Sequence, residues 1–160
     1  MGVERRHRPG GAITTTTANR STANLATIKE ICEAFSRGDI PAILDKVAPG
    51  CRWESWENNR AQHAGVPTLQ PRTGPEGAAQ FFTVVSELEI HDFQILDVLA
   101  SEHQVAAEIM IDYTTPTGGR LRDEEVHLWT LDDQQRVTRL RHYVDTTKHI
   151  AAFAGEDTTA

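Results

Sequence analysis

Apolar residues in the first half of the chain recur three or four positions apart, which is the spacing of one buried face of a helix. This spacing predicts three helices. The first starts near Leu25, with Thr22 or Asn24 as its cap. A second, short helix follows Asp39, and a third opens at the Gly-Pro-Glu sequence of residues 74–76.

In the second half the spacing changes to an alternation of apolar and polar residues, which is typical of strands. A strand at residues 51–57 and a long polar loop at 58–73, a candidate lid, come before this part of the chain. Four consecutive strands joined by tight turns are predicted, at residues 90–100, 105–114, 121–131 and 137–145. The order predicts an α+β fold with about three helices packed on a curved, mostly antiparallel sheet.

Composition and charge limit the classes of protein to consider. The 160 residues are expected to form one domain, residues 23–154, between a disordered tail of residues 1–22 and a frayed end of residues 155–160. The net charge of −7 argues against a nucleic-acid partner, because a phosphate-binding surface needs an excess of lysine and arginine. No apolar run is long enough to span a bilayer and no signal peptide is recognised, so no membrane partner and a cytoplasmic location are expected.

Several short strings of residues carry a resemblance to a known family. They are A-F with G-D at 34–39, W-E-S-W at 53–56, R-T-G-P-E-G at 72–77, H-L-W-T-L at 127–131 and V-T-R-L-R-H-Y-V-D-T at 137–146. With the order of the elements over residues 24–153, they resemble the nuclear transport factor 2-like superfamily. Within it, they are most similar to the SnoaL-like polyketide cyclases and the ketosteroid isomerase-like proteins.

The resemblance implies a cone-shaped fold that encloses a hydrophobic cavity, commonly in a homodimer. Members include isomerases, cyclases, dehydratases, epoxide hydrolases and proteins that only bind ligands, so the fold does not imply one function. The preferred hypothesis is an isomerase-like or cyclase-like enzyme that moves a proton on a hydrophobic carbonyl compound, without cofactor or metal. The alternative is a module of the same fold that binds a small molecule, or dimerises, without catalysis.

Epoxide hydrolysis is disfavoured by a comparison of individual positions. The arginine and aspartate pair of the epoxide hydrolase branch would fall at Glu108 and Met110, and its third aspartate at His142. None of the three residues matches, so the known mechanism of that branch lacks its groups in this chain.

The pairing of the last two predicted strands decides which side chains face the cavity. The favoured register sets Val126 opposite His142 and Leu128 opposite Leu140 on an apolar face, which is taken as the cavity wall. The other face holds aromatic and arginine side chains and is expected to meet a second copy of the chain. Its members are Glu125, His127, Trp129, Arg139, Arg141 and Tyr143.

Two residues of the last strand are candidates for acid/base chemistry. His142 is expected either to exchange protons in the apolar wall or to be a hydrogen-bonded core histidine. Through the resemblance, Asp145 matches the catalytic aspartate that ends this strand in SnoaL-like cyclases; the alternative is a helix cap. The two positions have opposite parity, so both reach one cavity only if the strand twists or bulges near Tyr143.

Other residues are expected to contact the ligand. The spacing of Trp53 and Trp56 lets at most one of them face the cavity from a strand. Glu108 or Asp112 is expected to orient His142, or else to lie on a solvated face. The remaining members of the expected binding set are His63, Phe81 and Met110.

No metal site is expected, because no group of histidine, aspartate or glutamate residues has the spacing of metal ligands. His91, His103 and His149 are expected at turns or on the surface. The two cysteines, Cys32 and Cys51, are expected to be reduced thiols.

Overall fold

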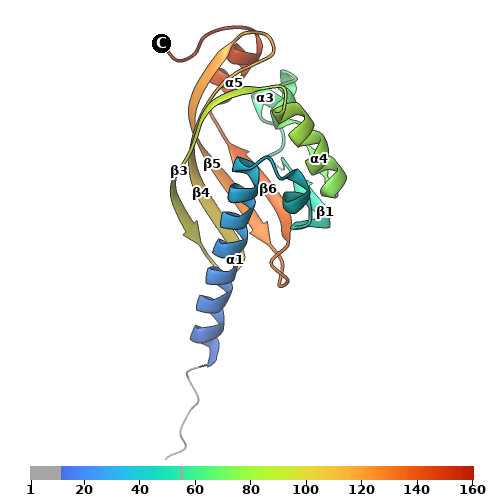
Figure 1. The fold of residues 1–160 in the computed structure, drawn as a ribbon, viewed down its shortest axis with the longest axis vertical. Helices are drawn as coiled ribbons and strands as arrows, with labels where there is room; N and C mark the ends of the chain where they lie inside the picture. Colours follow the sequence, from blue (N-terminus) through green and yellow to red (C-terminus); the bar gives the residue numbers. More distant parts are fainter. Residues whose placement is uncertain (1–11, 55) are drawn as a thin grey trace, which may run out of the picture.

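The computed structural model of the chain describes residues 12–54 and 56–160. In this part of the chain, five α-helices pack on a six-stranded sheet that is curved and not closed (Figure 1). In chain order the elements are α1 (Ala12–Ser36), α2 (Ile40–Leu44), β1 (Val47–Trp53), α3 (Arg60–His63), the 3₁₀ helix η1 (Pro67–Leu69), β2 (Arg72–Thr73), α4 (Gly74–Val85), β3 (Glu89–Ala100), β4 (Gln104–Thr114), β5 (Arg120–Leu131), β6 (Val137–Tyr143) and α5 (Thr146–Phe153). The predicted α+β fold class is confirmed.

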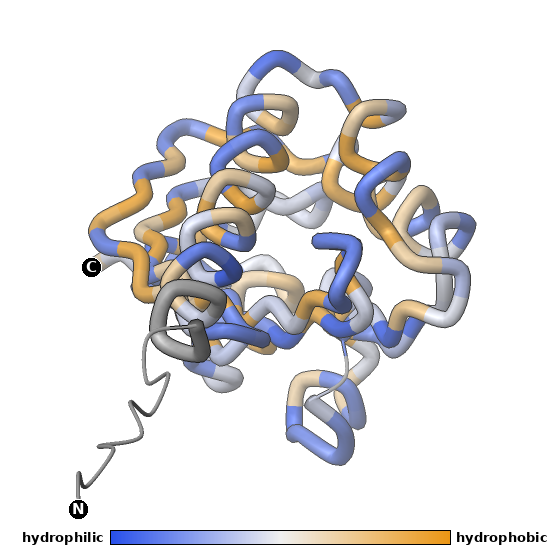
Figure 2. Tube along the Cα trace, turned by 90° about the horizontal axis from the view of Figure 1, so that it is seen from below, coloured by the Kyte–Doolittle hydropathy of each residue, from blue (hydrophilic) through white to orange (hydrophobic). Residues whose placement is uncertain are grey.

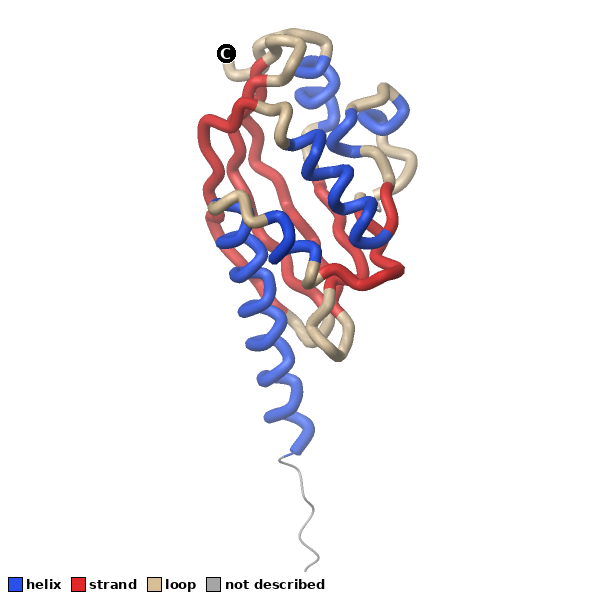
Figure 3. Tube along the Cα trace, turned by 45° about the vertical axis from the view of Figure 1, so that its right-hand side comes forward, coloured by secondary structure: helices blue, strands red, loops and turns tan. Residues whose placement is uncertain are grey.

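The sheet has the strand order β2-β1-β6-β5-β4-β3. Strands β3 to β6 form an antiparallel meander, whereas β1 runs parallel to β6. Helices α1, α2 and α4 lie on one face of the curved sheet, and α5 lies at one end of it (Figures 1 and 3). The cavity described below is lined by residues of these three helices and of the inner face of the sheet.

The four strands predicted for the second half are confirmed as β3 to β6, and the second and third predicted helices as α2 and α4. The early strand ends at Trp53, so Trp56 is not part of it. The expected loop of residues 58–73 is largely folded, because it contains α3, η1 and β2.

Helix α1 is longer than the apolar spacing predicted. It begins at Ala12 and not near Leu25, so residues 12–22 of the expected disordered tail are helical. Residues 1–11 of that tail lie outside the described part of the chain. None of the described helices is both long and apolar enough to cross a membrane.

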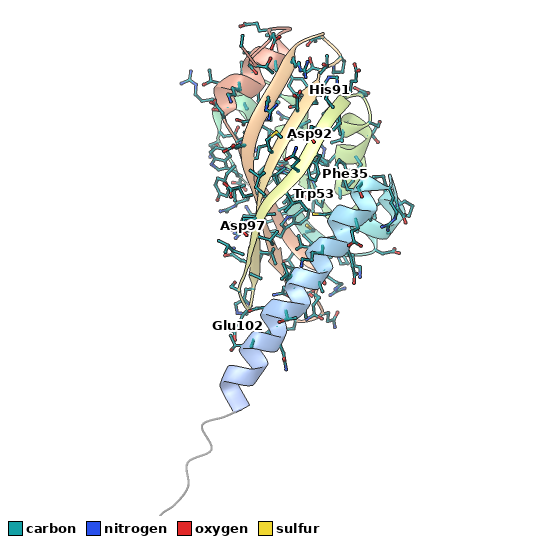
Figure 4. All side chains as sticks on the ribbon, turned by 60° about the vertical axis from the view of Figure 1, so that its left-hand side comes forward. Phe35, Trp53, His91, Asp92, Asp97 and Glu102 are labelled. Carbon is teal, nitrogen blue, oxygen red and sulfur yellow. The ribbon has the colours of Figure 1, made fainter. Side chains whose placement is uncertain are left out.

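The extension of α1 is fixed by contacts with the turn between β3 and β4. Asn24, one of the two expected caps, lies inside the helix and is only 1% exposed. Its amide donates hydrogen bonds to the carbonyl oxygens of Ser101, at 3.2 Å, and Glu102, at 2.9 Å. The Thr17 hydroxyl also contacts the Glu102 carboxylate, and Figure 4 shows Glu102 beside the helix. These contacts are between distant segments, which a local spacing cannot reveal.

The core is built around Trp53, at the end of β1. Its ring lies 5.5 Å from that of Phe81, 5.7 Å from Phe82 and 5.8 Å from Trp129, measured between centroids. The two phenylalanines belong to α4 and Trp129 to β5, so this cluster joins the helical layer to the sheet. In Figure 2 hydrophobic and hydrophilic stretches alternate along the trace, as expected for elements with one buried face.

The anchor of α1 can be tested by replacing Asn24. The change Asn24→Ala leaves the two turn carbonyls without their donor, and we expect it to lower the free energy of unfolding by about 1–3 kcal/mol. Urea denaturation followed by circular dichroism measures this loss. Thr22→Ala, at an exposed position of the same helix, is the matched control and should change stability by less than about 0.5 kcal/mol. Equal effects of the two changes would contradict the anchor.

Candidate functional site

The pairing of β5 with β6 differs from the predicted register by one residue over most of its length. Next to the turn, Leu131 pairs with Val137, as the prediction requires. The next pair is Thr130 with Arg139, so Thr138 is an extra residue that forms a bulge in β6. Beyond the bulge every pair is shifted by one, and the predicted register is wrong there because a sequence pattern does not reveal a bulge.

The shift exchanges the faces of β5. His127 pairs with His142 and Trp129 pairs with Leu140, so these side chains share the inner face. Val126, expected in the cavity wall, is instead 39% exposed on the outer face. Leu128 has the same parity as Val126 and pairs with Arg141, so it too lies on the outer face. His142 and Leu140 remain on the inner face, as predicted, while Glu125, His127 and Trp129 leave the expected partner-facing set.

The expected hydrophobic cavity lies between the helices and the inner face of the sheet. Its volume is about 100 Å³, compared with about 10–15 Å³ needed for one water molecule. Most of its lining is apolar, from α1, α4 and the strands, and includes Phe35 and Trp53, both labelled in Figure 4. Among the described residues that line it there is no lysine or arginine. Its polar members are Thr68, Tyr113, Glu125, His127, His142 and His149, beside Cys32.

A chain of buried hydrogen bonds forms the polar part of the cavity wall. The Tyr113 hydroxyl lies 3.3 Å from Nδ1 of His149, and Nε2 of His149 lies 3.0 Å from Oε1 of Glu125. The second carboxylate oxygen, Oε2, lies 2.9 Å from Nε2 of His127. Two strands and a helix therefore contribute to one network: β4 gives Tyr113, β5 gives Glu125 and His127, and α5 gives His149.

The charge of Glu125 fixes where the protons of this network lie. Burial alone would raise the pKa of Glu125, but the hydrogen bonds from His127 and His149 outweigh burial and lower this pKa to about 2. An ionised carboxylate only accepts hydrogen bonds, so both histidines donate from Nε2. The Tyr113 hydroxyl then donates to Nδ1 of His149 when that ring is neutral, and Nδ1 of a neutral His127 carries no proton.

His142 is the second imidazole of the site, and a second buried glutamate contacts it. The carboxylate of Glu54 meets Nδ1 of His142, and Glu54 is 1% exposed. Glu54 follows Trp53 directly and has a positive φ of 57°, a conformation that is uncommon outside glycine and often found at functional sites. Burial lowers the pKa of His142 to about 3, with a smaller effect from His149, so the ring is neutral at pH 7.

The two imidazoles lie against each other in the cavity wall. The ring centroids of His127 and His142 are 4.1 Å apart, and the planes are nearly perpendicular, at 79°. Phe81 stacks on His142 at 5.6 Å and leaves the ring little freedom to turn. Each imidazole is thus paired with its own buried glutamate, Glu125 or Glu54, an arrangement that can accept and return protons.

Asp145, the other acid/base candidate, is exposed and does not line the cavity. It is the N-cap of α5, and its Oδ1 accepts hydrogen bonds from the backbone N–H groups of Thr147, at 3.0 Å, and Lys148, at 3.2 Å. The bulge needed near Tyr143 is not there, since Tyr143 pairs regularly with Val126. The structure therefore does not bring Asp145 and His142 to one site.

The other expected ligand contacts divide between the cavity and the rest of the molecule. Trp53 and Phe81 line the cavity. Trp56 lies elsewhere, with its ring 5.2 Å from that of Tyr143. His63 and Glu108 are exposed, and neither of them lines the cavity.

Met110 and Asp112 are buried, but on the side of β4 that faces away from the cavity. Asp112 forms an ion pair with Arg120, with Nε 3.1 Å from Oδ1, and the hydrogen bond from Arg120 lowers its pKa. The alternation predicted for this strand is correct. The carboxylates that contact His127 and His142 are instead those of Glu125, in β5, and Glu54, the residue after β1.

His149 is buried and not on the surface, and it belongs to a group that could hold a metal ion. Asp123, Glu125 and His149 each offer a ligand atom, and these atoms lie within 4.8 Å of one another. The polar atoms already have protein partners: Nζ of Lys148 lies 3.3 Å from Oδ1 of Asp123, and His149 donates to Glu125. The residues come from two elements far apart in sequence, so no local spacing could have indicated them.

Comparison with known proteins agrees with this architecture. A sequence profile of the SnoaL-like domain family matches residues 28–140, well over half of the chain, and the chain belongs to this family. No curated protein matches the chain.

Solved structures with the same fold include three from bacteria. A nuclear transport factor 2-like protein of unknown function from Burkholderia pseudomallei K96243 has 22% identity and a TM-score of 0.66, covering 81% of this chain and 96% of that one. Rv0760c from Mycobacterium tuberculosis, in complex with estradiol-17β-hemisuccinate, has 14% identity and a TM-score of 0.62, covering 79% and 96%. An M. tuberculosis epoxide hydrolase described as LEH-like has 15% identity and a TM-score of 0.62, covering 84% and 90%. These matches show the fold alone, and the expected SnoaL-like family is confirmed by the sequence profile.

The buried His142 makes stability depend on pH. The unfolded chain binds a proton at this residue near pH 6.5, and the folded chain only near pH 3. The contribution of His142 to the free energy of unfolding is therefore fully present above pH 6.5 and decreases as the pH falls from 6.5 toward 3. We expect protonation of this residue to lower the free energy of unfolding by about 1–2 kcal/mol between pH 6.5 and pH 5. Below pH 4.5 protonation of Glu125 in the unfolded chain adds to the loss.

Urea denaturation between pH 5 and pH 7.5 measures this dependence. His142→Gln should weaken the dependence of the free energy of unfolding on pH above pH 5. His103→Gln, at an exposed position, should leave this dependence as it is in the unchanged protein. If the free energy of unfolding changes with pH in the same way in all three proteins, His142 does not titrate as its burial requires.

Proposed function

We propose that the protein is an acid/base enzyme that moves a proton on a neutral, hydrophobic carbonyl compound and needs no cofactor to do so. The observation that carries this proposal is the pair of imidazoles, His127 and His142, in contact at 4.1 Å in the wall of an apolar cavity. Each imidazole has a buried glutamate on one side and one nitrogen left for a ligand.

The chemistry would use the two imidazoles in turn. A neutral imidazole takes the proton from a carbon next to the carbonyl group, the C–H electron pair moves into the C–C–O unit, and an enolate forms. Glu54 beside His142, or Glu125 beside His127, stabilises the imidazolium. Return of the proton to the same or a different carbon gives exchange or isomerisation. This scheme differs from the hypothesis based on the sequence in using Glu54 and His127 in place of Asp145.

The family supports a small hydrophobic ligand. The structural neighbour Rv0760c was solved with estradiol-17β-hemisuccinate, whose steroid part is apolar, and the cavity of this chain is also largely apolar. The apolar lining, and the absence of lysine and arginine from the described residues of that lining, suit a neutral molecule better than an ionised one.

Proton transfer can be tested with 1-indanone, cyclohexanone and 1-tetralone in D₂O. Proton NMR follows deuterium uptake at the carbon next to the carbonyl group. We expect the protein to accelerate uptake by at least one ketone that binds it, and His142→Gln and His127→Gln to lower that rate about 100-fold or more. Asp145→Asn should retain the full rate, because asparagine is also a good N-cap.

Two results would contradict the proposal. One is uptake no faster than in buffer for every ketone whose binding is detected. The other is a loss of activity in Asp145→Asn as large as in His142→Gln, which would return the catalytic role to the aspartate.

A binding protein without catalysis is the second candidate, and one observation favours it. Burial lowers the pKa of His142 to about 3, which makes the isolated ring a weak base. In that case the network would only hold a ligand, and the ketones above would bind without exchange.

We further propose a homodimer through the outer face of the sheet, as the sequence led us to expect. This face carries Leu99, which is 69% exposed, and Val126, at 39%. A row of paired residues, Leu99, Ala106 and Leu128, crosses three strands of this face. Exposed apolar side chains on an uncovered sheet are the type of surface that a second copy would bury.

Light scattering during gel filtration tests the assembly. We expect a dimer, and we expect Leu99→Glu combined with Val126→Glu to give a monomer with an unchanged circular dichroism spectrum. Thr83→Glu, at an exposed position of α4, is the control and should remain dimeric. A monomeric unchanged protein, or a dimeric double variant, would contradict this interface.

A further inference from the structure

Three buried polar atoms at the cavity have no hydrogen-bond partner within the described part of the chain. They are the indole Nε1 atoms of Trp53 and Trp129 and the Oγ1 atom of Thr68. All three residues line the cavity. Buried donors are nearly always paired in folded proteins, so unpaired ones beside a cavity need a partner from outside the chain.

The unpaired groups call for a ligand that accepts hydrogen bonds. An indole N–H can only donate, so Trp53 and Trp129 cannot be satisfied by a hydrocarbon. The two rings lie edge to face, with centroids 5.8 Å apart and planes at 83°, so both border one region of the cavity. A carbonyl oxygen has two lone pairs and can accept from both donors.

The charge of the cavity excludes the commonest strong acceptor, a carboxylate. No lysine or arginine is found among the described residues of the lining. Glu125 is ionised there, and the buried carboxylate of Glu54 lies behind His142. A ligand carboxylate would enter a poorly solvated site with like charge and no cation to pair with it, which is unfavourable.

We propose that the indole N–H groups of Trp53 and Trp129 bind the carbonyl oxygen of a neutral ligand. This inference rests on the proposed function for the identity of the reaction, but the binding itself does not require catalysis. It assigns to the two tryptophans the recognition of the ligand oxygen, and it predicts that the protein selects a neutral ketone over both the matching hydrocarbon and the matching acid.

The position of the donors agrees with proton transfer by the imidazoles. Trp129 follows His127 by two residues on the inner face of β5, a separation of roughly 7 Å along a strand. The ring of Phe81 is in contact with the rings of both Trp53 and His142. An oxygen held at the indoles would therefore place its neighbouring carbon toward the histidines, and the donors would stabilise the negative oxygen of the enolate.

NMR of the three indole N–H groups tests the assignment directly. The ¹⁵N-labelled protein is titrated with 1-indanone, with indane, which lacks the oxygen, and with indane-1-carboxylate. We expect the ketone to move the proton resonance of Trp53 or Trp129, or both, downfield, and indane to cause no downfield shift. Trp56, whose ring packs on Tyr143 away from the cavity, is the internal control, and the carboxylate should bind at least 10-fold more weakly than the ketone.

Replacing the donors separates hydrogen bonding from packing. Trp53→Phe and Trp129→Phe should each weaken binding of 1-indanone about 3- to 10-fold relative to binding of indane, the factor that one hydrogen bond of ordinary strength gives. Trp56→Phe should leave both affinities unchanged. Comparing ketone with hydrocarbon in each variant cancels any general loss of packing.

The result that overturns this proposal is distinct from failure of the proposed function. If the ketone and indane bind equally well and neither indole resonance moves downfield, the N–H groups face neighbouring rings and the proposal is wrong. If the indole resonances move but no deuterium enters the ketone, the oxygen site stands and the protein is a binder. His142→Gln, expected to abolish exchange, should leave the indole shifts in place.

Discussion

The arrangement of the site depends on one extra residue in β6. Thr138 forms a bulge, and beyond it every residue of β6 pairs one position away from the register at the turn. Because side chains alternate between the faces of a sheet, this shift sets His142 opposite His127 and turns both toward the cavity. Without the bulge, His127 and His142 would lie on opposite faces of the sheet, and the cavity would lose one of its two imidazoles.

The second requirement is compensation of buried charge. An ionised carboxylate in an apolar interior is costly unless hydrogen bonds satisfy it. Glu125 meets this requirement with two histidine donors, at 2.9 and 3.0 Å. Because its two oxygens accept these hydrogen bonds, Nε2 of each of the two rings carries a proton. Such a network is lost as a unit when one member is removed, since the others are then buried without partners.

The sequence predicted the fold better than the site, and the reasons are physical. Apolar spacing and turn residues are local, and they gave four strands of the meander and two helices close to their observed positions. His142, Trp53, Phe81 and Leu140 were also placed correctly at the cavity. The start of α1 was missed because the amide of Asn24 binds a turn distant in sequence.

The site was missed where it depends on register and on contacts between distant segments. Glu125 and His127 were assigned to the wrong face because no pattern marks Thr138 as a bulge. Glu54 stands directly after Trp53, but only the fold brings it to His142. One signal was available: the alternation of Asp123, Glu125, His127 and Trp129 along one face of β5 is polar at a spacing that elsewhere is apolar. In a strand predicted to be buried, the face with such a polar series is as good a candidate for the interior as the face with an apolar series.

The central claim is that two imidazoles, each beside a buried glutamate, line one cavity, and that each ring holds its proton on the nitrogen next to its glutamate. Histidine ¹⁵N NMR at pH 7 tests it most directly, with His127→Gln and His142→Gln to assign the resonances. We expect a proton on Nε2 of His127 and on Nδ1 of His142, with a neutral ring at His142. The opposite tautomer in either ring, or an imidazolium at His142, would contradict the claim.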